Sequence, residues 1–191
     1  ASYLNATSNW EDKVEAGRGW SYGAEFFVQK KKGKTTGMLG YTLSWTNRRF
    51  ANLNNGQTFP YKYDRRHDLK IALVHKVSDR FEVSADWVFG TGQAITLPTA
   101  VYLDDEGNEV ETYDSRNGFR MRSYHRFDLS GRFTKQKKHW ERSWVISVYN
   151  LYNRRNPFYI YRNNDDFSGN TVFKQISLFP VIPSISYQVK F

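Results

Sequence analysis

The charged stretch at residues 64–68, Asp-Arg-Arg-His-Asp, is one of the few places in this sequence where side chains able to do chemistry stand together. Its imidazole, His67, is flanked by guanidinium groups that could hold an anion such as a phosphate. Runs of this kind are more often networks of exposed ion pairs, each of which contributes little to stability. We therefore interpret the stretch mainly as an ion-pair network at the end of a strand.

Two acidic clusters offer carboxylate oxygens, which are the ligands that calcium prefers. The clusters are formed by Asp104, Asp105, Glu106 and Glu109, and by Asp165 and Asp166. Neither has the alternating acidic ligands of a calcium-binding loop. We interpret both clusters as solvated turns and expect no metal site.

Recognisable sets of catalytic residues are absent from the sequence. We find no Ser-His-Asp set, His-Glu-x-x-His motif, phosphate-binding glycine loop or glycosidase carboxylate pair. Cysteine is also absent, so the chain can form neither a disulfide nor a thiolate metal site. We therefore expect no catalytic residue, no cofactor and no enzymatic activity.

The net charge of +9 at pH 7 is compatible with a nucleic acid or an anionic membrane surface as a partner. No nucleic-acid-binding motif accompanies the charge, so we expect a solvated basic surface and no nucleic-acid partner. Aromatic residues make up 17% of the chain, which is unusually many. Tyrosine and tryptophan favour places where one end of the side chain is dry and the other is wet.

Alternation of apolar and polar residues organises the chain into strands. The pattern predicts about seven strands in an antiparallel meander and no helix of useful length. The expected strands lie near residues 22–29, 39–46, 68–76, 81–89, 127–133, 144–149 and from about 172 to the end, and long polar loops lie at about 47–64 and 91–121. Within the second loop, residues 101–103 and 110 flank a turn and predict a small hairpin.

The last predicted strand runs to the final residue and has a strict alternation. Its apolar face carries Ile185, Tyr187, Val189 and Phe191. Pro180 and Pro183 predict a bulge or kink where the pattern shifts. A strand at the end of a chain must pair on both sides or leave an open edge, and closing a barrel is one way to pair it.

Alternation alone does not separate a soluble sandwich from a membrane barrel, because both have one apolar and one polar face. The connections alternate between short and long, which favours a barrel with short periplasmic turns and long external loops. Aromatic residues near strand ends would form its girdles. These residues are Tyr41, Trp45, Trp87, Phe89 and Trp144. We therefore predict an all-β, antiparallel up-and-down transmembrane β-barrel, with the chain end on the periplasmic side.

Bacterial single-chain barrels have even strand numbers, so about seven strands predict a part of a larger barrel. The sequence begins with Ala1 rather than methionine and has no signal peptide. We therefore expect a processed chain or a fragment of a longer one.

Ordered stretches over nearly the whole chain resemble the C-terminal portion of TonB-dependent outer-membrane receptors. The resemblance is strongest to the branch whose N-terminus bears a carboxypeptidase-regulatory-like domain. The stretches are GRGWSYGAE at 17–25, GYTLS at 40–44, FP at 59–60, YDRRHD at 63–68, YHRFD at 124–128, YNLYNRRNPF at 149–158 and LFPVIPS at 178–184.

This resemblance implies a barrel of about 22 strands, of which residues 1–191 would be about the last third. The plug domain and the TonB box would be absent, so this chain alone would not be an energised transporter. The family imports scarce nutrients, such as siderophores, cobalamin or oligosaccharides, across the outer membrane of Gram-negative bacteria. The implied partners are outer-membrane lipid and lipopolysaccharide, the rest of the receptor including its plug, the barrel assembly machinery, and the TonB complex through the missing N-terminal part.

Ligand contacts would come from the long loops, because loops on a rigid scaffold carry binding and because aromatic and arginine side chains dominate contact energies. The loop candidates are Asn54, Tyr61, Tyr102, Tyr113, Arg120 and Arg162. The polar face of the strands would pair its charges across strands or contact a plug through Lys70, Glu82, Asp86, Arg126, Asp128 and Arg132. The resemblance also implies that Ile185, Tyr187, Val189 and Phe191 form a signal for barrel assembly.

Two alternatives stay open. One is a small, self-contained outer-membrane barrel with a structural or adhesive role, and the other is a soluble β-sandwich that serves as a binding module. Dependence on detergent would separate the sandwich from either barrel. A plug domain encoded upstream would exclude the small barrel.

Overall fold

The computed structural model describes residues 14–164 and 171–191. Within these residues the chain is all-β, with antiparallel strands and a short 3₁₀ turn, η3, at Asn54–Gly56, which confirms the all-β, antiparallel part of the predicted fold class. The chain divides into two compact units. Unit 1 comprises residues up to 23 with 44–65 and 93–121, and unit 2 comprises residues 24–43, 66–92 and 122–191.

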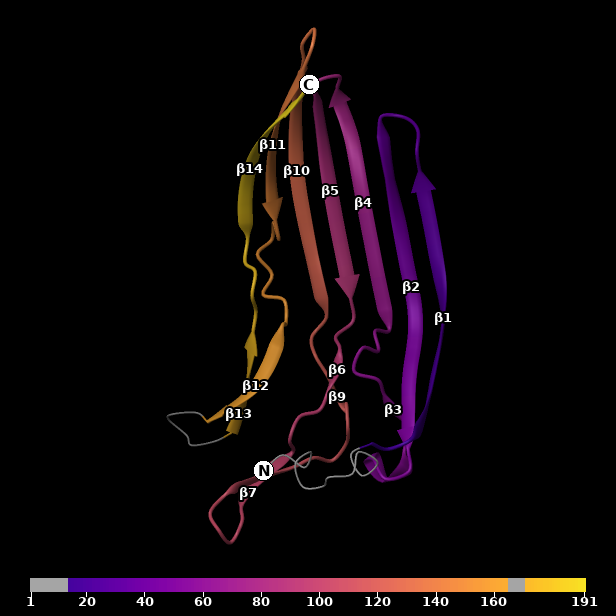
Figure 1. Ribbon diagram of the computed structural model, residues 1–191, viewed down its shortest axis with the longest axis vertical. Helices are drawn as coiled ribbons and strands as arrows, with labels where there is room; N and C mark the ends of the chain where they lie inside the picture. Colours follow the sequence, from indigo (N-terminus) through magenta and orange to yellow (C-terminus); the bar gives the residue numbers. More distant parts are fainter. Residues whose placement is uncertain (1–13, 165–170) are drawn as a thin grey trace. The chain divides into compact units, whose positions relative to one another are not determined.

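The main sheet has the strand order β1-β2-β4-β5-β10-β11-β14 within the described residues, and β3 pairs with β2 (Figure 1). Its strands are β1 (Gly17–Lys30), β2 (Thr35–Phe50), β3 (Phe59–Pro60), β4 (His67–Ser78), β5 (Phe81–Gly90), β10 (Tyr124–Gln136), β11 (Glu141–Tyr149) and β14 (Ile182–Lys190). From β2 to β14 each strand is antiparallel to its neighbour. This order is the predicted meander.

Three two-stranded ribbons complete the described strands. They pair β6 (Ala94–Ile95) with β9 (Phe119–Arg120), β7 (Ala100–Leu103) with β8 (Glu109–Thr112), and β12 (Tyr159–Asn164) with β13 (Thr171–Ile176). The β7–β8 ribbon is the small hairpin that the sequence predicts.

Apolar side chains cover one face of the sheet in unit 2. The register forms rows of facing residues across neighbouring strands, because side chains alternate between the two faces. One row contains Leu39, Ile71, Trp87 and Phe127, and another contains Phe81, Phe133, Trp144 and Tyr187. The first row is half-buried, whereas side chains in and beside the second row are exposed, including Phe133 at 51%, Ile146 at 51% and Ile185 at 65%. Large apolar area in unit 2 is therefore left without a covering layer among the described residues.

The opposite face of the same strands is polar. Short hydroxyl side chains meet across strands there, with Ser84 and Ser130 at 2.6 Å and Ser147 and Ser184 at 2.7 Å. Arg132 Nε lies 3.4 Å from Glu82 on the next strand. The six charged residues predicted for this face all lie on it, as the register requires.

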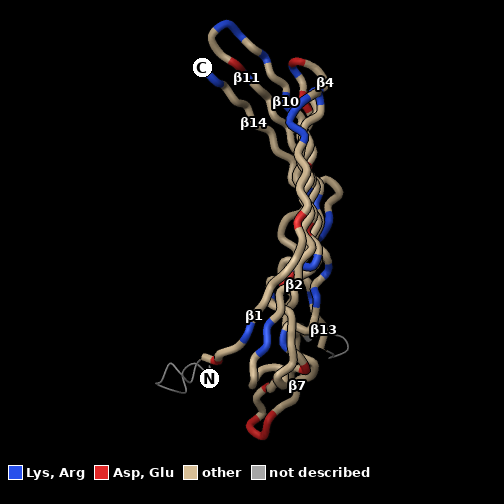
Figure 2. The backbone as a smooth tube through the Cα atoms, turned by 90° about the vertical axis from the view of Figure 1, so that its right-hand side faces the viewer, with Lys and Arg blue, Asp and Glu red and all other residues tan. Residues whose placement is uncertain are grey.

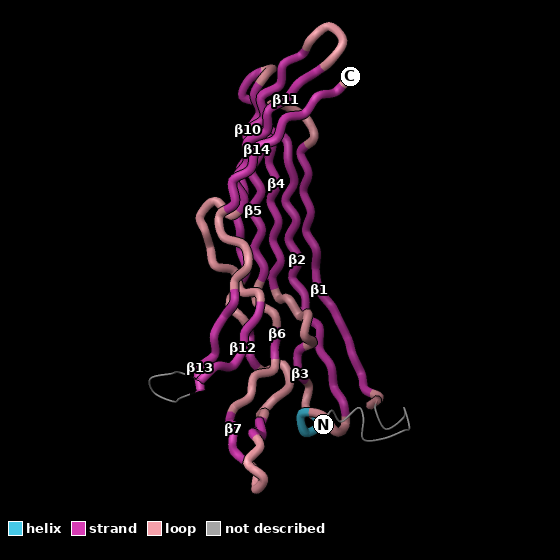
Figure 3. The backbone as a smooth tube through the Cα atoms, turned by 60° about the vertical axis from the view of Figure 1, so that its left-hand side comes forward, coloured by secondary structure: helices cyan, strands magenta, loops and turns pink. Residues whose placement is uncertain are grey.

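Short and long connections alternate along the sheet, as predicted. The short connections are residues 31–34, 79–80 and 137–140, and the long ones are 51–66, 91–123 and 150–181. Lys190 of β14 faces Glu141, beside the short turn at 137–140. In an antiparallel meander the short turns and the C-terminal residue thus share one end of the unit 2 sheet, as Figure 3 shows.

Unit 1 is formed by the ends of β1 and β2 and by long connections. The hydrophobic residues that are buried within the described part of the chain are Phe59, Ala94 and Met121, and all three belong to this unit. The backbone N–H of Met121 donates to Gln93 O at 3.0 Å beside the β6–β9 ribbon. A small core therefore forms where the two long connections meet.

The structure corrects three of the predicted boundaries. Strand β1 begins at Gly17, five residues before the expected start near residue 22. Strand β2 continues to Phe50 instead of ending near residue 46, because Asn47 and Arg48 pair with β3. The single last strand predicted from about residue 172 is wrong, since β13 pairs with β12 whereas β14 pairs with β11. Pro180 lies in the break between β13 and β14, and Pro183 lies within β14.

The sheet does not close on itself within the described residues, where β1 and β14 form its two edges. The closed barrel of the sequence prediction is therefore not observed. Within residues 14–164 and 171–191, no helix is long and apolar enough to cross a membrane.

Candidate functional site

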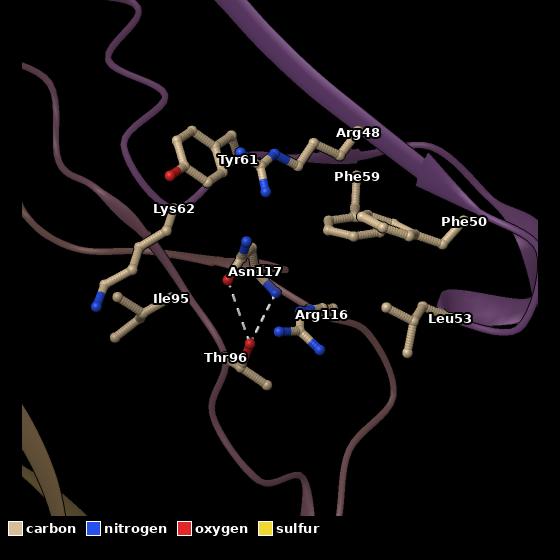
Figure 4. Close-up of a pocket in the computed structure, with 10 residues that line it drawn as sticks. All are labelled: Arg48, Phe50, Leu53, Phe59, Tyr61, Lys62, Ile95, Thr96, Arg116 and Asn117. Atoms are coloured by element: carbon tan, nitrogen blue, oxygen red, sulfur yellow. Dashed lines mark hydrogen bonds between the residues drawn. The ribbon is translucent and has the colours of Figure 1, made fainter. Parts of the chain in front are cut away.

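A pocket of about 460 Å³ lies in unit 1 between its two long connections (Figure 4). Its apolar lining consists of Phe50, Leu53, Phe59, Tyr61 and Ile95, and its polar lining consists of Arg48, Lys62, Thr96, Arg116 and Asn117. The pocket is thus lined by both aromatic rings and cationic side chains. Its volume lies in the range of small-molecule sites.

The first wall of the pocket comes from β2 and β3. Because Arg48 and Phe59 face each other in the antiparallel pair, the side chains around them converge. The rings of Phe50 and Phe59 stack with centroids 6.0 Å apart. The guanidinium of Arg48 lies 3.6 Å from the ring centroid of Tyr61, as Figure 4 shows. Phe59 is only 4% exposed, which anchors this wall in the core of unit 1.

The second wall comes from the connection between β5 and β10. Asn117 has a φ of 54°, a left-handed conformation that asparagine tolerates better than most residues. Its backbone N–H donates to Thr96 Oγ1 at 2.9 Å, and its side-chain amide donates to Pro60 O at 2.9 Å. The backbone N–H of Arg116 donates to Asn54 Oδ1 at 3.0 Å. These bonds hold the two walls together.

Unit 1 contains a buried ion pair. Asp64 has 0% exposure and pairs with the guanidinium of Arg120, which also donates to Asp64 O at 3.0 Å. The backbone N–H of Thr46 donates to Asp64 Oδ1 at 2.6 Å. One carboxylate therefore joins β2, the connection after β3 and strand β9.

The pocket has a strongly positive lining. Arg48, Lys62 and Arg116 contribute three cations, and no carboxylate is among its described lining residues. The ion pairs found in the described part of the chain include none of these three cations. Lys62 Nζ lies 5.7 Å from the ring centroid of Tyr63. An arrangement of cations and aromatic faces can attract and orient an anion.

A second pocket of about 540 Å³ adjoins the first and shares Leu53, Thr96 and Arg116 with it. Its lining adds Asn54, Asn55, Tyr113, Asp114 and Ser115. Arg116 therefore lines both pockets, and the second pocket also contains the acidic side chain of Asp114.

The structure brings three of the six predicted loop residues together. Tyr61 lines the first pocket, and Asn54 and Tyr113 line the second. Tyr102 lies on the β7–β8 ribbon, where it is 53% exposed and lines neither pocket. Its assignment as a ligand residue has no support from the pocket geometry.

The other two predicted loop residues have different surroundings. Arg120 is engaged with the buried Asp64, and its predicted ligand contact stays a prediction. Arg162 lies on β12, where it faces Phe173, and belongs to unit 2.

The sequence analysis missed Arg48, Arg116 and Asn117. The signal available for Arg48 was its position at the end of a strand, two residues before the aromatic residue Phe50.

His67, the imidazole of the charged stretch, belongs to unit 2. Its Nδ1 lies 2.8 Å from the hydroxyl of Tyr41, and its backbone N–H donates to Thr91 Oγ1 at 3.1 Å. Its neighbour Asp64 is buried, so the interpretation of residues 64–68 as an exposed ion-pair network is wrong for that residue. Hydrogen bonds of Asp64 and His67 thus connect this stretch to Thr46 and Tyr41 on β2 and to Thr91, the residue after β5.

A polar network fixes the long connection after β11 in unit 2. The fully buried Asn150 donates its backbone N–H to Asp128 Oδ1 at 2.8 Å and its side-chain amide to Phe179 O at 3.0 Å. Arg126 Nε lies 2.8 Å from Asp128, and the guanidinium lies 4.2 Å from the ring centroid of Tyr149. Much of the stretch at 149–158 therefore has a structural role.

The acidic turn at 104–108 closes the β7–β8 hairpin, whose acidic tip is visible in Figure 2. Asp104 Oδ1 accepts the backbone N–H groups of Asn108 at 2.7 Å and of Glu106 at 3.0 Å. The hydrogen bonds from Asn108, helped by those from Glu106 and Gly107, hold the pKa of Asp104 below its usual value. The second acidic cluster, Asp165 and Asp166, lies outside the described residues.

The predicted assembly residues lie on one face of β14 and at the chain end. Ile185, Tyr187 and Val189 share the apolar face of the unit 2 sheet, and Phe191 is 97% exposed. Within the described residues β14 pairs on one side with β11. A role in assembly stays a prediction.

Comparisons of the chain with protein-family models, with curated proteins and with solved structures found no significant match.

Proposed function

We propose that this chain is a wall segment of an outer-membrane β-barrel, namely the C-terminal part of a TonB-dependent transporter. The observation that carries the proposal is the unit 2 sheet, which has an exposed apolar face on one side and a hydroxyl-rich, charged face on the other. Such a sheet is unfavourable in water, because its apolar face would stay hydrated. Lipid on the apolar side and an aqueous lumen on the polar side would satisfy both faces.

The strand lengths support a membrane position. Strands β5, β11 and β14 have 10, 9 and 9 residues. A tilted strand that spans a bilayer needs about 9–11 residues. Strands β1, β2, β4 and β10 are longer, with 14, 16, 12 and 13 residues. All seven of these strands would therefore be long enough to cross the hydrocarbon layer.

Aromatic side chains stand at both ends of the apolar face. Near the short turns, Phe81 stacks on Phe133 at 4.2 Å and Trp144 meets Tyr187 at 4.7 Å. Toward the other end of β5, the rings of Trp87 and Phe89 lie 6.1 Å apart. Two belts of this kind suit the two interfaces of a bilayer.

The two alternatives fit the geometry less well. A sandwich needs a second sheet on the apolar face, and the side chains there are exposed in the described structure. A small self-contained barrel needs its first and last strands to pair, whereas β1 and β14 are separate edges within the described residues. Both edges would instead pair with further strands of a barrel of about 22 strands.

The transport role follows from the resemblance and from the unit 1 pocket. The pocket is built from long connections, which face the outside in such barrels and commonly carry binding. The solute would be a scarce nutrient, taken up with the help of a plug and of the TonB complex acting through the N-terminal part of the receptor. Lipopolysaccharide and outer-membrane lipid would surround the wall, and the barrel assembly machinery would insert it.

Surface labelling tests the proposed position and orientation. A short epitope inserted at Gly107, in the tip of the β7–β8 hairpin, should be labelled on intact cells. The same epitope inserted at Gly33, in a short turn, should be labelled only after the outer membrane is opened. Both glycines lie in turns and have positive φ, which makes the insertions a matched pair. Labelling of both epitopes only in lysed cells, or recovery of the protein in the soluble fraction, would overturn the proposal.

A second measurement tests the transport role. Uptake of the solute by intact cells should stop when the TonB complex is deleted, although the amount of protein in the outer membrane stays the same. Normal growth and uptake without the TonB complex would leave the barrel position standing and remove the transporter assignment.

A further inference from the structure

We propose that the unit 1 pocket binds a small organic anion that carries an aromatic ring, that is, an aryl carboxylate or aryl phosphate. The binding itself depends on unit 1 alone, whereas the identification of this anion as the transported solute rests on the proposed function. Three features of the pocket support this ligand class, namely its charge, its ring surface and its rigidity.

The charge of the pocket selects an anion. Arg48, Lys62 and Arg116 line it without a carboxylate among the described lining residues. A cationic ligand would meet three like charges and no counter-charge, which is unfavourable. A guanidinium presents several N–H donors in one plane, so Arg48 and Arg116 suit the paired oxygens of a carboxylate or phosphate.

The neighbour of Arg48 shows how specific this placement is. Arg49 Nε donates to Gly56 O at 2.7 Å and does not line the pocket. Arg48 instead lies 3.6 Å from the ring centroid of Tyr61. Stacking on Tyr61 fixes the plane of the guanidinium and leaves the N–H edge free for a ligand.

The ring surface selects a flat apolar group beside the charge. Phe50 and Phe59 stack at 6.0 Å, and Tyr61 and Ile95 extend the apolar lining, as Figure 4 shows. Aromatic rings pack well on such surfaces in offset or edge-to-face arrangements. A volume of about 460 Å³ accommodates one substituted ring.

The walls are rigid enough to keep this arrangement before a ligand arrives. Asn117 bonds to Thr96 and Pro60, and Phe59 is buried. A preformed site loses less conformational entropy on binding than a mobile loop does. The pocket is therefore a site and not merely a basic surface.

The test uses the intact protein in a non-ionic detergent, with phenyl phosphate and benzoate as probes and isothermal titration calorimetry as the measurement. Phenol supplies the ring without the charge, and inorganic phosphate supplies the charge without the ring. We expect the two aryl anions to bind at least about tenfold more tightly than either partial probe, which corresponds to about 1.4 kcal/mol. Their affinity should fall as the ionic strength rises.

Three variants locate the binding. The double variant Arg48→Gln/Arg116→Gln should weaken phenyl phosphate binding about tenfold or more, because it removes charge-assisted hydrogen bonds. The variant Tyr61→Leu should lower the preference for aryl anions over inorganic phosphate. Arg49→Gln removes the same charge at the adjacent position and should leave the affinity unchanged.

Three outcomes would overturn the proposal. They are equal affinity for phenol and phenyl phosphate, an equal loss of phenyl phosphate affinity in Arg49→Gln and in the double variant, and no binding of either aryl anion at about 10 mM. None of these outcomes changes the surface labelling of Gly107 or the dependence on TonB. A failure of this inference is thus distinct from a failure of the proposed function.

Discussion

At the scale of single residues, the buried carboxylate of Asp64 holds the loop region of unit 1 together. Replacing it by asparagine would keep the shape but remove the charge that Arg120 and the Thr46 N–H require. Hydrogen bonds to a charged group contribute about 1.5–3 kcal/mol, and the partly exposed Arg120 lowers the expected loss toward the smaller value. We predict that Asp64→Asn makes the Thr46 amide exchange its hydrogen at least about tenfold faster, measured by hydrogen exchange.

The matched control for this prediction is Asp114→Asn, which removes an exposed carboxylate of the same unit that accepts a hydrogen bond from Thr99. Exchange at Thr46 should not change in this variant. Unchanged exchange in Asp64→Asn itself would mean that the neighbouring strands, and not the carboxylate, hold the segment.

The turn of the β7–β8 hairpin should depend on pH through Asp104. Its pKa is lowered by hydrogen bonds from Asn108 and, to a smaller extent, from Glu106 and Gly107. A lowered pKa in the folded state means that the stabilisation is complete above the ordinary value of 3.8 and is lost as the pH falls through the lowered pKa. We predict that the Asn108 and Glu106 amide signals in NMR spectra shift together in that acidic range. Asp104→Asn should abolish this shift, whereas Asp105→Asn should preserve it.

The sequence revealed the chemistry of single residues but not their partners. Asp64 stood in a charged run that resembled an exposed network, and its partner Arg120 is 56 positions away. Nothing in local periodicity specifies such a distant pair, because burial is decided by the fold of two connections together. Tyr61 was predicted as a ligand residue from its type, whereas Arg48 and Arg116 become visible as a pair only in three dimensions.

At the scale of elements, strand β14 offers a test of the two faces of the sheet. Ile185 lies on the apolar face and is 65% exposed, and Ser186 points to the opposite face. A lysine on the lipid side of a barrel costs up to about 2–4 kcal/mol near the middle of the bilayer, whereas lumen positions tolerate charge. We predict that Ile185→Lys lowers the stability of the intact protein in lipid vesicles by about this amount, measured by urea unfolding, and that Ser186→Lys does not. Equal effects of both variants would contradict a lipid-facing side.

The connection between β5 and β10 offers a second test. Ile95, Thr96, Arg116 and Asn117 line the first pocket, whereas the β7–β8 hairpin between them does not. Replacing residues 91–121 with a short linker should abolish binding of the aryl anion, because one wall is lost. Removing residues 100–111 alone should preserve it, because the backbone N–H of Thr99 donates to Thr112 O at 2.8 Å, so the two ends of the deletion already lie close together. Unchanged affinity after the larger replacement would move the site elsewhere.

Strands with a period of two were predicted well, because alternation is a property of each strand alone. The strands at β4, β5, β10 and β11 have nearly the expected bounds. The boundary between β13 and β14 was not predicted, since both segments are apolar and only their different partners, β12 and β11, separate them. The extension of β2 was missed for the same reason, because β3 supplies the pairing.

At the scale of the molecule, the two units differ in how they bury apolar surface. The buried hydrophobic residues in the described part of the chain lie in unit 1. The unit 2 sheet has large exposed side chains such as Phe133, Trp144 and Ile146 on one face, together with two unpaired edges of the main sheet within the described residues. Ordinary folding in water depends on burying such surface. The proposed membrane position would supply surroundings that are not aqueous for this face.

This difference predicts how the isolated chain behaves. In buffer without detergent, residues 1–191 should not form a stable monomer, because open strand edges and an exposed apolar face favour aggregation. Gel filtration should show aggregates, and near-UV circular dichroism should lack a fixed aromatic signal. Addition of detergent micelles should recover strand content, since micelles cover the apolar face. A sharp monomer peak with a strong near-UV signal in plain buffer would contradict the membrane assignment and favour the sandwich, because only a covered apolar face can give an ordered monomer in water.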